Sequence, residues 1–200
     1  MGKVGIKTAL FGFITNFILF LLKLYIGISS NSLSIYCDAV NNLGDTLSCI
    51  IVLVGSVFIL KLDETRSNRM QALAGFVIGL ILTVTGFYFA YNGLERCFYP
   101  VKISYLKIYA LLLAVTIAVK FIMGIVYFKV NQKNSSPIFR TLILDSFLDC
   151  AVTAITLIGF TLTIKINFAV DGIMAIVIGT IVAISAAKEI IAQAKTLING

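Results

Sequence analysis

The sequence predicts an all-α membrane protein with six transmembrane helices, and three observations support this prediction. Of the 200 residues, 60% are hydrophobic, and the mean hydropathy is +1.03. Only 12% of the residues are charged, whereas soluble domains carry about 25%. The apolar residues form long runs between short polar segments, and a spanning helix needs about 20 of them. The chain length therefore allows about six spans and excludes an ordinary soluble fold.

The apolar runs place the spans at residues 8–28, 33–60, 71–94, 104–128, 138–163 and 168–192. The first run lacks a small-residue cleavage site, so we interpret it as a retained helix. With the N-terminus inside, ten basic residues fall on the cytoplasmic side and four on the outer side. This asymmetry predicts that both termini are cytoplasmic. It also explains the net charge of +7 without nucleic-acid binding.

Two of the predicted spans carry side chains that a bilayer disfavours. These are Asp38, Asn41, Asn42 and Asp45 in the second span, and Asp145 and Asp149 in the fifth. A carboxylate at bilayer depth costs about 2.5–3.5 kcal/mol on insertion scales. A bound cation, a proton or a partner charge must therefore compensate for them.

The two acidic spans belong to an internal repeat. Lys23 and Lys120 occupy similar positions in the first and fourth spans. Ser32 precedes Asp45 by thirteen residues, and a second serine precedes Asp149 by the same distance. Two halves of three spans each would have opposite orientations in the membrane, which is a recurrent plan for transporters with a polar site near the midplane.

The acidic residues have the spacing of a helix face. Asn41 and Asp45 are four residues apart, as are Asp145 and Asp149, so each pair shares one face. If the two faces meet, three carboxylates and one amide converge and can bind a divalent cation through oxygen. The alternative is that the acids pair with the lysines of the first and fourth spans, or lie in water-filled loops.

These residues resemble the cation diffusion facilitator family. The segment DAVNNLGD at 38–45 is similar to the second-helix signature of the family, and LDSFLDC at 144–150 is similar to the fifth-helix signature. The likeness extends to Asn16, Lys23, Lys120 and Asp171. The resemblance implies a homodimeric transporter in the cell membrane that exports divalent metal ions in exchange for protons. It implies no bound cofactor, and it assigns Asn41, Asp45, Asp145 and Asp149 to the transported metal.

The four site positions favour manganese as the cargo. Zinc-transporting members of the family place histidine where this chain has Asn41 or Asp145, and the chain contains no histidine. An asparagine with three aspartates resembles the manganese-exporting branch. Oxygen donors suit Mn²⁺, whereas imidazole suits zinc. Efflux of Zn²⁺, Fe²⁺ or Co²⁺ by the same fold is the alternative. Cys49 and Cys150 flank the site and could add a soft ligand that favours zinc or cadmium, but we interpret them as core-packing residues.

The sequence departs from the family pattern in two places. The loop after the second helix, KLDETRSNRMQ, lacks the usual histidine-bearing motif, so we do not expect a second metal site around Asp63 and Glu64. The cytosolic C-terminal domain of the family does not follow the sixth helix within residues 1–200. We therefore interpret the chain as a single transmembrane cation-efflux domain.

Two further aspartates are predicted near the outer face. Asp38 lies seven residues before Asp45, and Asp171 begins the sixth helix. Both could line an outer vestibule. For Asp171, capping of its own helix is an equally good interpretation.

Two other functions are compatible with parts of the sequence. The segment NLGD, which ends at Asp45, partly resembles the motif of intramembrane aspartyl proteases, and Asp149 could be the second acid. Two close carboxylates that share a proton would carry out that chemistry. A transport-inactive membrane subunit is the other alternative. We expect a transporter and no enzyme activity, because proteolysis does not need the four-residue partner that each acid has.

Overall fold

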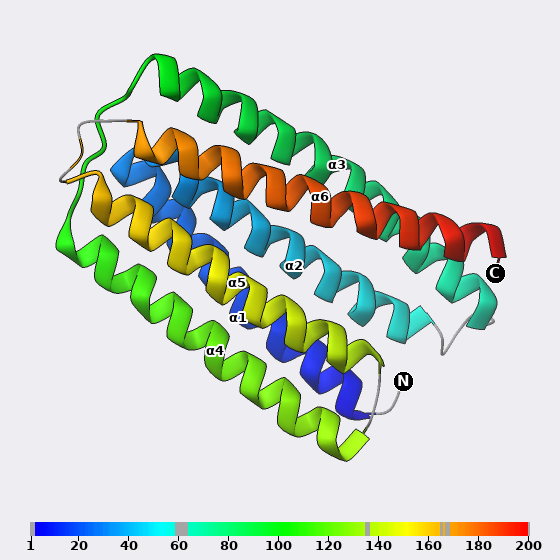
Figure 1. Ribbon diagram of the computed structural model, residues 1–200. Helices are drawn as coiled ribbons and strands as arrows, with labels where there is room; N and C mark the ends of the chain where they lie inside the picture. The colour runs from blue at the N-terminus through cyan, green and yellow to red at the C-terminus, as the bar shows by residue number, and fades with distance from the viewer. Residues whose placement is uncertain (1–2, 59–63, 135–136, 165, 167–168, 200) are drawn as a thin grey trace.

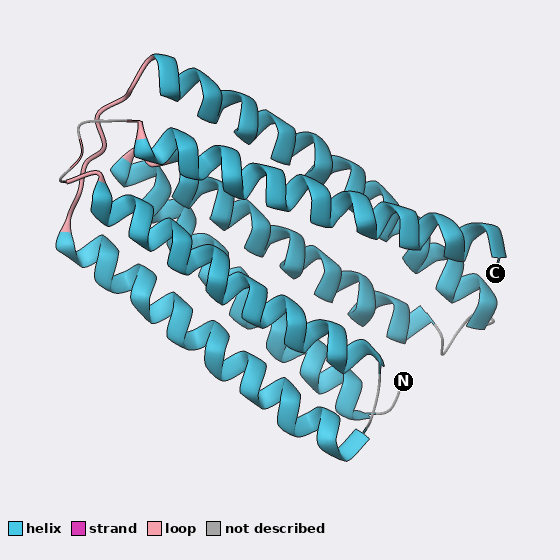
Figure 2. Cartoon of the chain, in the orientation of Figure 1, coloured by secondary structure: helices cyan, strands magenta, loops and turns pink. Residues whose placement is uncertain are grey.

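The computed structural model describes residues 3–58, 64–134, 137–164, 166 and 169–199. Within them lie six helices, namely α1 (Lys3–Ser30), α2 (Leu33–Phe58), α3 (Glu64–Phe98), α4 (Lys107–Asn134), α5 (Pro137–Leu162) and α6 (Val170–Asn199). Each helix is long and apolar enough to cross a membrane. The described residues contain no strand (Figure 2). The predicted all-α class with six spans is confirmed.

The helices extend beyond the apolar runs that predicted them. α3 begins at Glu64 and ends at Phe98, and α4 continues to Asn134. Helical hydrogen bonding continues through polar residues, so an apolar run marks the membrane-embedded part of a helix and not its ends. The predicted end of the second span at 60, the start of the sixth at 168, the loop acid at 63 and the serine at 136 lie outside the described residues.

Helix α2 occupies the centre of the bundle and packs against α1, α3, α5 and α6. Helices α3 and α6 run side by side along one edge (Figure 1). Helix α4 packs against α5 and α1. Helix α1 begins and helix α6 ends at the same end of the bundle (Figure 1), which we call the terminal end. The opposite end contains the turn between α1 and α2.

Glycine allows the close packing of α3 on α6. A Cβ atom added at Gly86 would lie 2.7 Å from the backbone oxygen of Gly179, and one added at Gly93 would lie 2.7 Å from that of Gly172. Without a hydrophobic driving force in lipid, close backbone approach of this kind provides van der Waals packing between helices. The α3–α6 pair is thus joined along most of its length.

Two apolar clusters lie around α2. One joins α2, α3, α5 and α6 through residues such as Cys37, Phe89 and Ile178. The other joins the first two helices to α4 and α5 through Ile35 and Phe160, among others. Both contain residues from the first turns of α2, which lie at the end opposite the chain termini. The polar side chains described next continue from these clusters toward the terminal end.

Candidate metal-transport site

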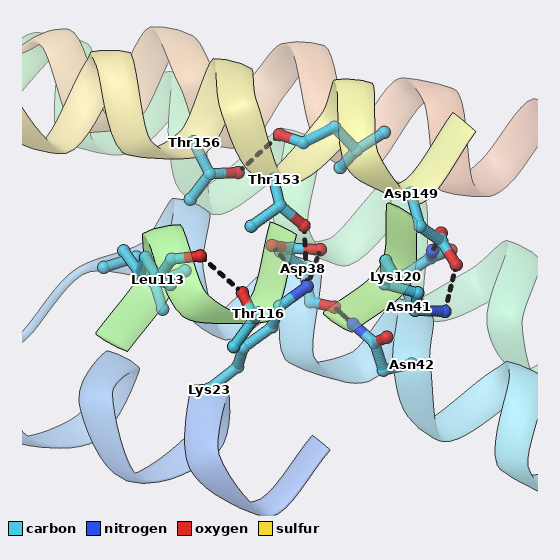
Figure 3. A network of polar contacts seen from close by, with 12 residues as sticks. Lys23, Asp38, Asn41, Asn42, Leu113, Thr116, Lys120, Asp149, Thr153 and Thr156 are labelled. Carbon is cyan, nitrogen blue, oxygen red and sulfur yellow. Dashed lines mark hydrogen bonds and ion pairs between the residues drawn. The ribbon is translucent and has the colours of Figure 1, made fainter. Parts of the chain in front are cut away.

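The faces of α2 and α5 that carry the predicted ligands meet in the bundle. The amide nitrogen of Asn41 on α2 donates a hydrogen bond of 2.7 Å to Asp149 Oδ1 on α5 (Figure 3). This contact spans 108 residues of sequence. It shows that the four-residue spacing on each helix directs these side chains toward the same interface.

A lysine from a third helix neutralises two of the acids. Lys120 of α4 donates to Asp45 Oδ2 at 2.9 Å and also to Asp149 Oδ2. The lysine is 1% exposed, whereas the Asp45 side chain is 28% exposed. An ammonium that contacts both carboxylates offsets much of the cost of burying negative charge on them. The structure therefore realises the alternative in which the acids pair with lysine.

The third carboxylate, that of Asp145, takes no part in the ion pairs of Lys120. Asp145 is exposed and is one helical turn from Asp149 toward the terminal end. Among the described residues, no lysine or arginine forms an ion pair with it. Asp145 is therefore the acid of the predicted set that forms no ion pair within the described part of the chain.

A cavity of about 120 Å³ connects the three carboxylates. Its polar lining comes from α1, α2, α4 and α5, and consists of Thr8, Asn16, Asp45, Ser48, Cys49, Lys120, Tyr127, Asp145, Ser146 and Asp149. Thr8 lies near the start of α1, and Tyr127 lies near the end of α4. The cavity therefore lies in the half of the bundle nearer the terminal end.

The predicted ligands surround this space without forming a ready coordination shell. Among the described residues, no three Asp, Glu or Cys side chains are close enough together to hold a metal ion. Asp45 and Asp149 are held by Lys120, and Asn41 directs its amide nitrogen, not its oxygen, at Asp149. Binding of a metal ion by all four residues would require these contacts to change.

A second buried ion pair lies farther from the terminal end. Lys23 of α1 contacts both carboxylate oxygens of Asp38 at 2.9 Å and donates to Thr153 Oγ1 of α5 at 2.7 Å (Figure 3). Both charged residues are fully buried. Asp38 was expected to line an outer vestibule, but its carboxylate is enclosed in this pair, because Lys23 reaches it from the neighbouring helix.

Asp171 has a different environment. Its carboxylate accepts hydrogen bonds from the backbone nitrogens of Leu33 and Ser34 and from the hydroxyl of Ser32. It also forms an ion pair of 3.0 Å with Arg96. Although Asp171 lies in the first turn of α6, it therefore caps the N-terminus of α2.

Asp171 also lines a cavity at the end opposite the chain termini. This cavity has a volume of about 460 Å³, and Arg96 and Lys102 contribute to its wall. Asp171 is thus placed where a vestibule was expected, while its oxygens are engaged by α2 and α3.

Several residues around the two buried ion pairs and the carboxylate-lined cavity were not predicted as site residues from the sequence. Lys23 and Lys120 served as markers of the repeat and appeared as possible ion-pair partners only in the alternative. Thr153 follows Asp149 by four residues and therefore shares its face of α5. This spacing could have identified Thr153 as a neighbour of the site. Asn16 and Tyr127 were not predicted to line the cavity, because the face that a helix turns inward depends on its packing.

Comparison with known proteins agrees with this architecture. Residues 9–198 match a family model described as the cation efflux transmembrane domain. The chain is also 27% identical over 184 residues to the uncharacterized transporter MJ0449 of Methanocaldococcus jannaschii. This alignment covers 88% of the chain and 64% of the relative. Both findings indicate a transporter and not an enzyme.

The buried Lys23–Asp38 pair generates a stability prediction. Replacing Lys23 with Met leaves the Asp38 charge without a partner, and breaking a buried pair in this way costs about 3–5 kcal/mol. The double variant Lys23→Met/Asp38→Asn removes both charges and should recover much of the loss. Thermal unfolding in detergent measures the effect, with the exposed lysine variant Lys102→Met as control. Equal destabilisation by the single and double variants would contradict the pairing.

Proposed function

We propose that the chain, which belongs to the cation efflux transmembrane family, moves divalent metal ions across a membrane, with Mn²⁺ as the favoured cargo. The main supporting observation is the cavity between α2 and α5. It is lined by Asp45, Asp145 and Asp149, and Asn41 contacts the last of these. In this proposal the metal ion is the transported substrate, and these four residues bind it.

The combined charge of the three cavity carboxylates and Lys120 fits a divalent ion. Three carboxylates and the Lys120 ammonium carry a combined charge of −2, which a divalent cation neutralises. From the sequence, a bound cation, a proton or a partner charge could each compensate for the carboxylates. The lysine now supplies part of that compensation. A monovalent cation would leave the group with a net negative charge at low dielectric, which is unfavourable.

The donor atoms support manganese. The proposed ligands offer carboxylate and amide oxygens, which suit Mn²⁺, and the chain has no histidine. One observation favours the alternative cargoes Zn²⁺, Fe²⁺ and Co²⁺. Cys49 lines the cavity, and its sulfur is a soft ligand. Cys150 donates to the backbone oxygen of Ile117 and is not part of the cavity wall.

We propose that transport couples metal efflux to proton entry. Metal ligands must be deprotonated to bind, so metal and protons compete for the same carboxylates. The three-helix halves could rock around the site between α2 and α5 and expose it alternately to the two sides. With the termini in the cytoplasm, the cavity of this structure lies in the cytoplasmic half, where the exposed Asp145 would be the first carboxylate to meet the ion.

Assembly and location follow from the family resemblance. We propose a homodimer in the cell membrane. The chain spans 64% of the length of the curated relative that it matches, so the activity and partners of a longer protein also remain proposals here. A transport-inactive subunit is the competing hypothesis, and a flux measurement separates the two.

Inverted vesicles that contain the protein provide this measurement. An imposed pH gradient, acidic inside, should drive Mn²⁺ uptake. Asp45→Asn and Asp149→Asn should each reduce uptake to the background rate, because each removes a charged ligand. Glu95→Gln, an exposed acid outside the site, is the matched control and should retain uptake. Wild-type vesicles that accumulate no metal under any gradient would favour the inactive subunit.

Cargo selectivity should depend on Asn41. We expect Asn41→His to raise the flux of Zn²⁺ relative to Mn²⁺ by about tenfold, because it adds an imidazole donor at the site. The ratio of the two fluxes in a mixture of both ions measures the effect. Asn92→His, at an amide outside the cavity, serves as control. An unchanged flux ratio would show that another residue, with Cys49 as the first candidate, determines the choice of metal.

A further inference from the structure

Lys120 contacts the two carboxylates that would bind the cargo. Its ammonium lies 2.9 Å from Asp45 Oδ2 and also bonds Asp149 Oδ2. A metal ion coordinated by both carboxylates would lie against this ammonium. Two cations in contact repel strongly in a buried site. If the proposed function holds, the ammonium must therefore leave the carboxylates when the metal binds.

Two buried oxygen atoms provide a place for the displaced ammonium. Asn16 is 3% exposed and Tyr127 is 0% exposed. Among the described residues, neither Asn16 Oδ1 nor Tyr127 Oη has a hydrogen-bond partner. Both residues line the same cavity as Lys120. Unpartnered buried polar atoms are rare and costly, so their presence beside a lysine calls for an explanation.

The positions of these residues suit a movement of the lysine side chain. Tyr127 follows Lys120 by seven residues, which is two turns along the same face of α4. A tyrosine side chain in a helix leans toward the N-terminus of the helix, and here that direction leads toward Lys120. An ammonium has three donors, and amide and hydroxyl oxygens can accept from it.

The local packing preserves this space. A Cβ atom at Gly12 of α1 would lie 2.7 Å from Tyr127 Oη and 3.0 Å from Cys49 Sγ. The absence of a side chain at Gly12 therefore leaves the tyrosine hydroxyl in place at the cavity wall. The cavity volume of about 120 Å³ far exceeds the 10–15 Å³ or so that one water molecule requires.

We propose that Lys120 is a tethered internal cation that exchanges with the cargo. It bridges Asp45 and Asp149 when no metal is bound. It moves to Asn16 Oδ1 and Tyr127 Oη when a divalent ion enters, and it returns as the ion leaves. The exchange keeps the carboxylates paired throughout the cycle and weakens metal binding enough to permit release. It also disfavours monovalent cations, which bring no additional charge to replace the ammonium.

A double-mutant cycle on Mn²⁺ binding to the full chain in detergent tests the proposal. Tyr127→Phe should weaken binding about tenfold, because the displaced ammonium loses a charged hydrogen bond. Lys120→Met should tighten binding by about tenfold or more, because a repelling charge is gone. In the Lys120→Met background, Tyr127→Phe should have no effect. Tyr25→Phe, at an exposed tyrosine, is the matched control.

The rate of transport provides a second measurement, which would not change in this way if Lys120 had only a structural role. Lys120→Met should lower both the KM and the maximal rate of Mn²⁺ uptake, because the ion binds more tightly and leaves more slowly. If Tyr127→Phe weakens binding by the same factor with and without Lys120, the tyrosine acts on the metal directly and the exchange is overturned. Wild-type protein that binds no Mn²⁺ would overturn the proposed function itself.

A second measurement applies if Lys120→Met does not fold. Asn16→Leu and Tyr127→Phe should each weaken Mn²⁺ binding in the presence of the native lysine. Tyr127→Phe should not lower the thermal stability of the metal-free protein, because it removes a buried hydroxyl that has no partner there among the described residues. Variants that lose metal-free stability and retain wild-type affinity would overturn the proposal.

Discussion

The ammonium of Lys120 between Asp45 and Asp149 is the interaction on which the site depends. It brings α4 to the interface of α2 and α5 and contacts one carboxylate from each of these two helices. Lys23 of α1 likewise contacts both helices, through the Asp38 carboxylate on α2 and the Thr153 hydroxyl on α5. Lipid gives no hydrophobic force that would press helices together. Two buried lysines, each contacting both α2 and α5, therefore hold the polar centre of the bundle.

The two ends of the bundle differ in a way that bears on function. At the end opposite the chain termini, Asp171 caps α2 and pairs with Arg96, so α2, α3 and α6 are joined there. Toward the terminal end, the same bundle contains the cavity lined by three carboxylates. Glycine contacts join α3 to α6 as a unit. A rocking motion that exposed the site to the other side would have to alter the Asp171 contacts with α2.

The sequence predicted the features that depend on local pattern. Apolar runs identified all six helices, and the four-residue spacing placed Asn41 at the interface where Asp149 lies. The sequence offered pairing of the acids with lysine only as an alternative, because that contact depends on how α4 is rotated against α5. It did not predict that Asp171 would cap a helix 138 residues earlier, since capping is normally local. Helix ends were also missed where polar residues continue the hydrogen-bond pattern. Metal binding itself remains a proposal.

The location of Mn²⁺ in crystals of the protein tests the central claim most directly. Anomalous scattering identifies the ion without prior assumptions about its ligands. The account predicts a peak in contact with Asn41, Asp45, Asp145 and Asp149, with the Lys120 ammonium displaced from both of its carboxylate partners. A peak outside the α2–α5 interface, or a bound ion beside a Lys120 that still bridges Asp45 and Asp149, would contradict it.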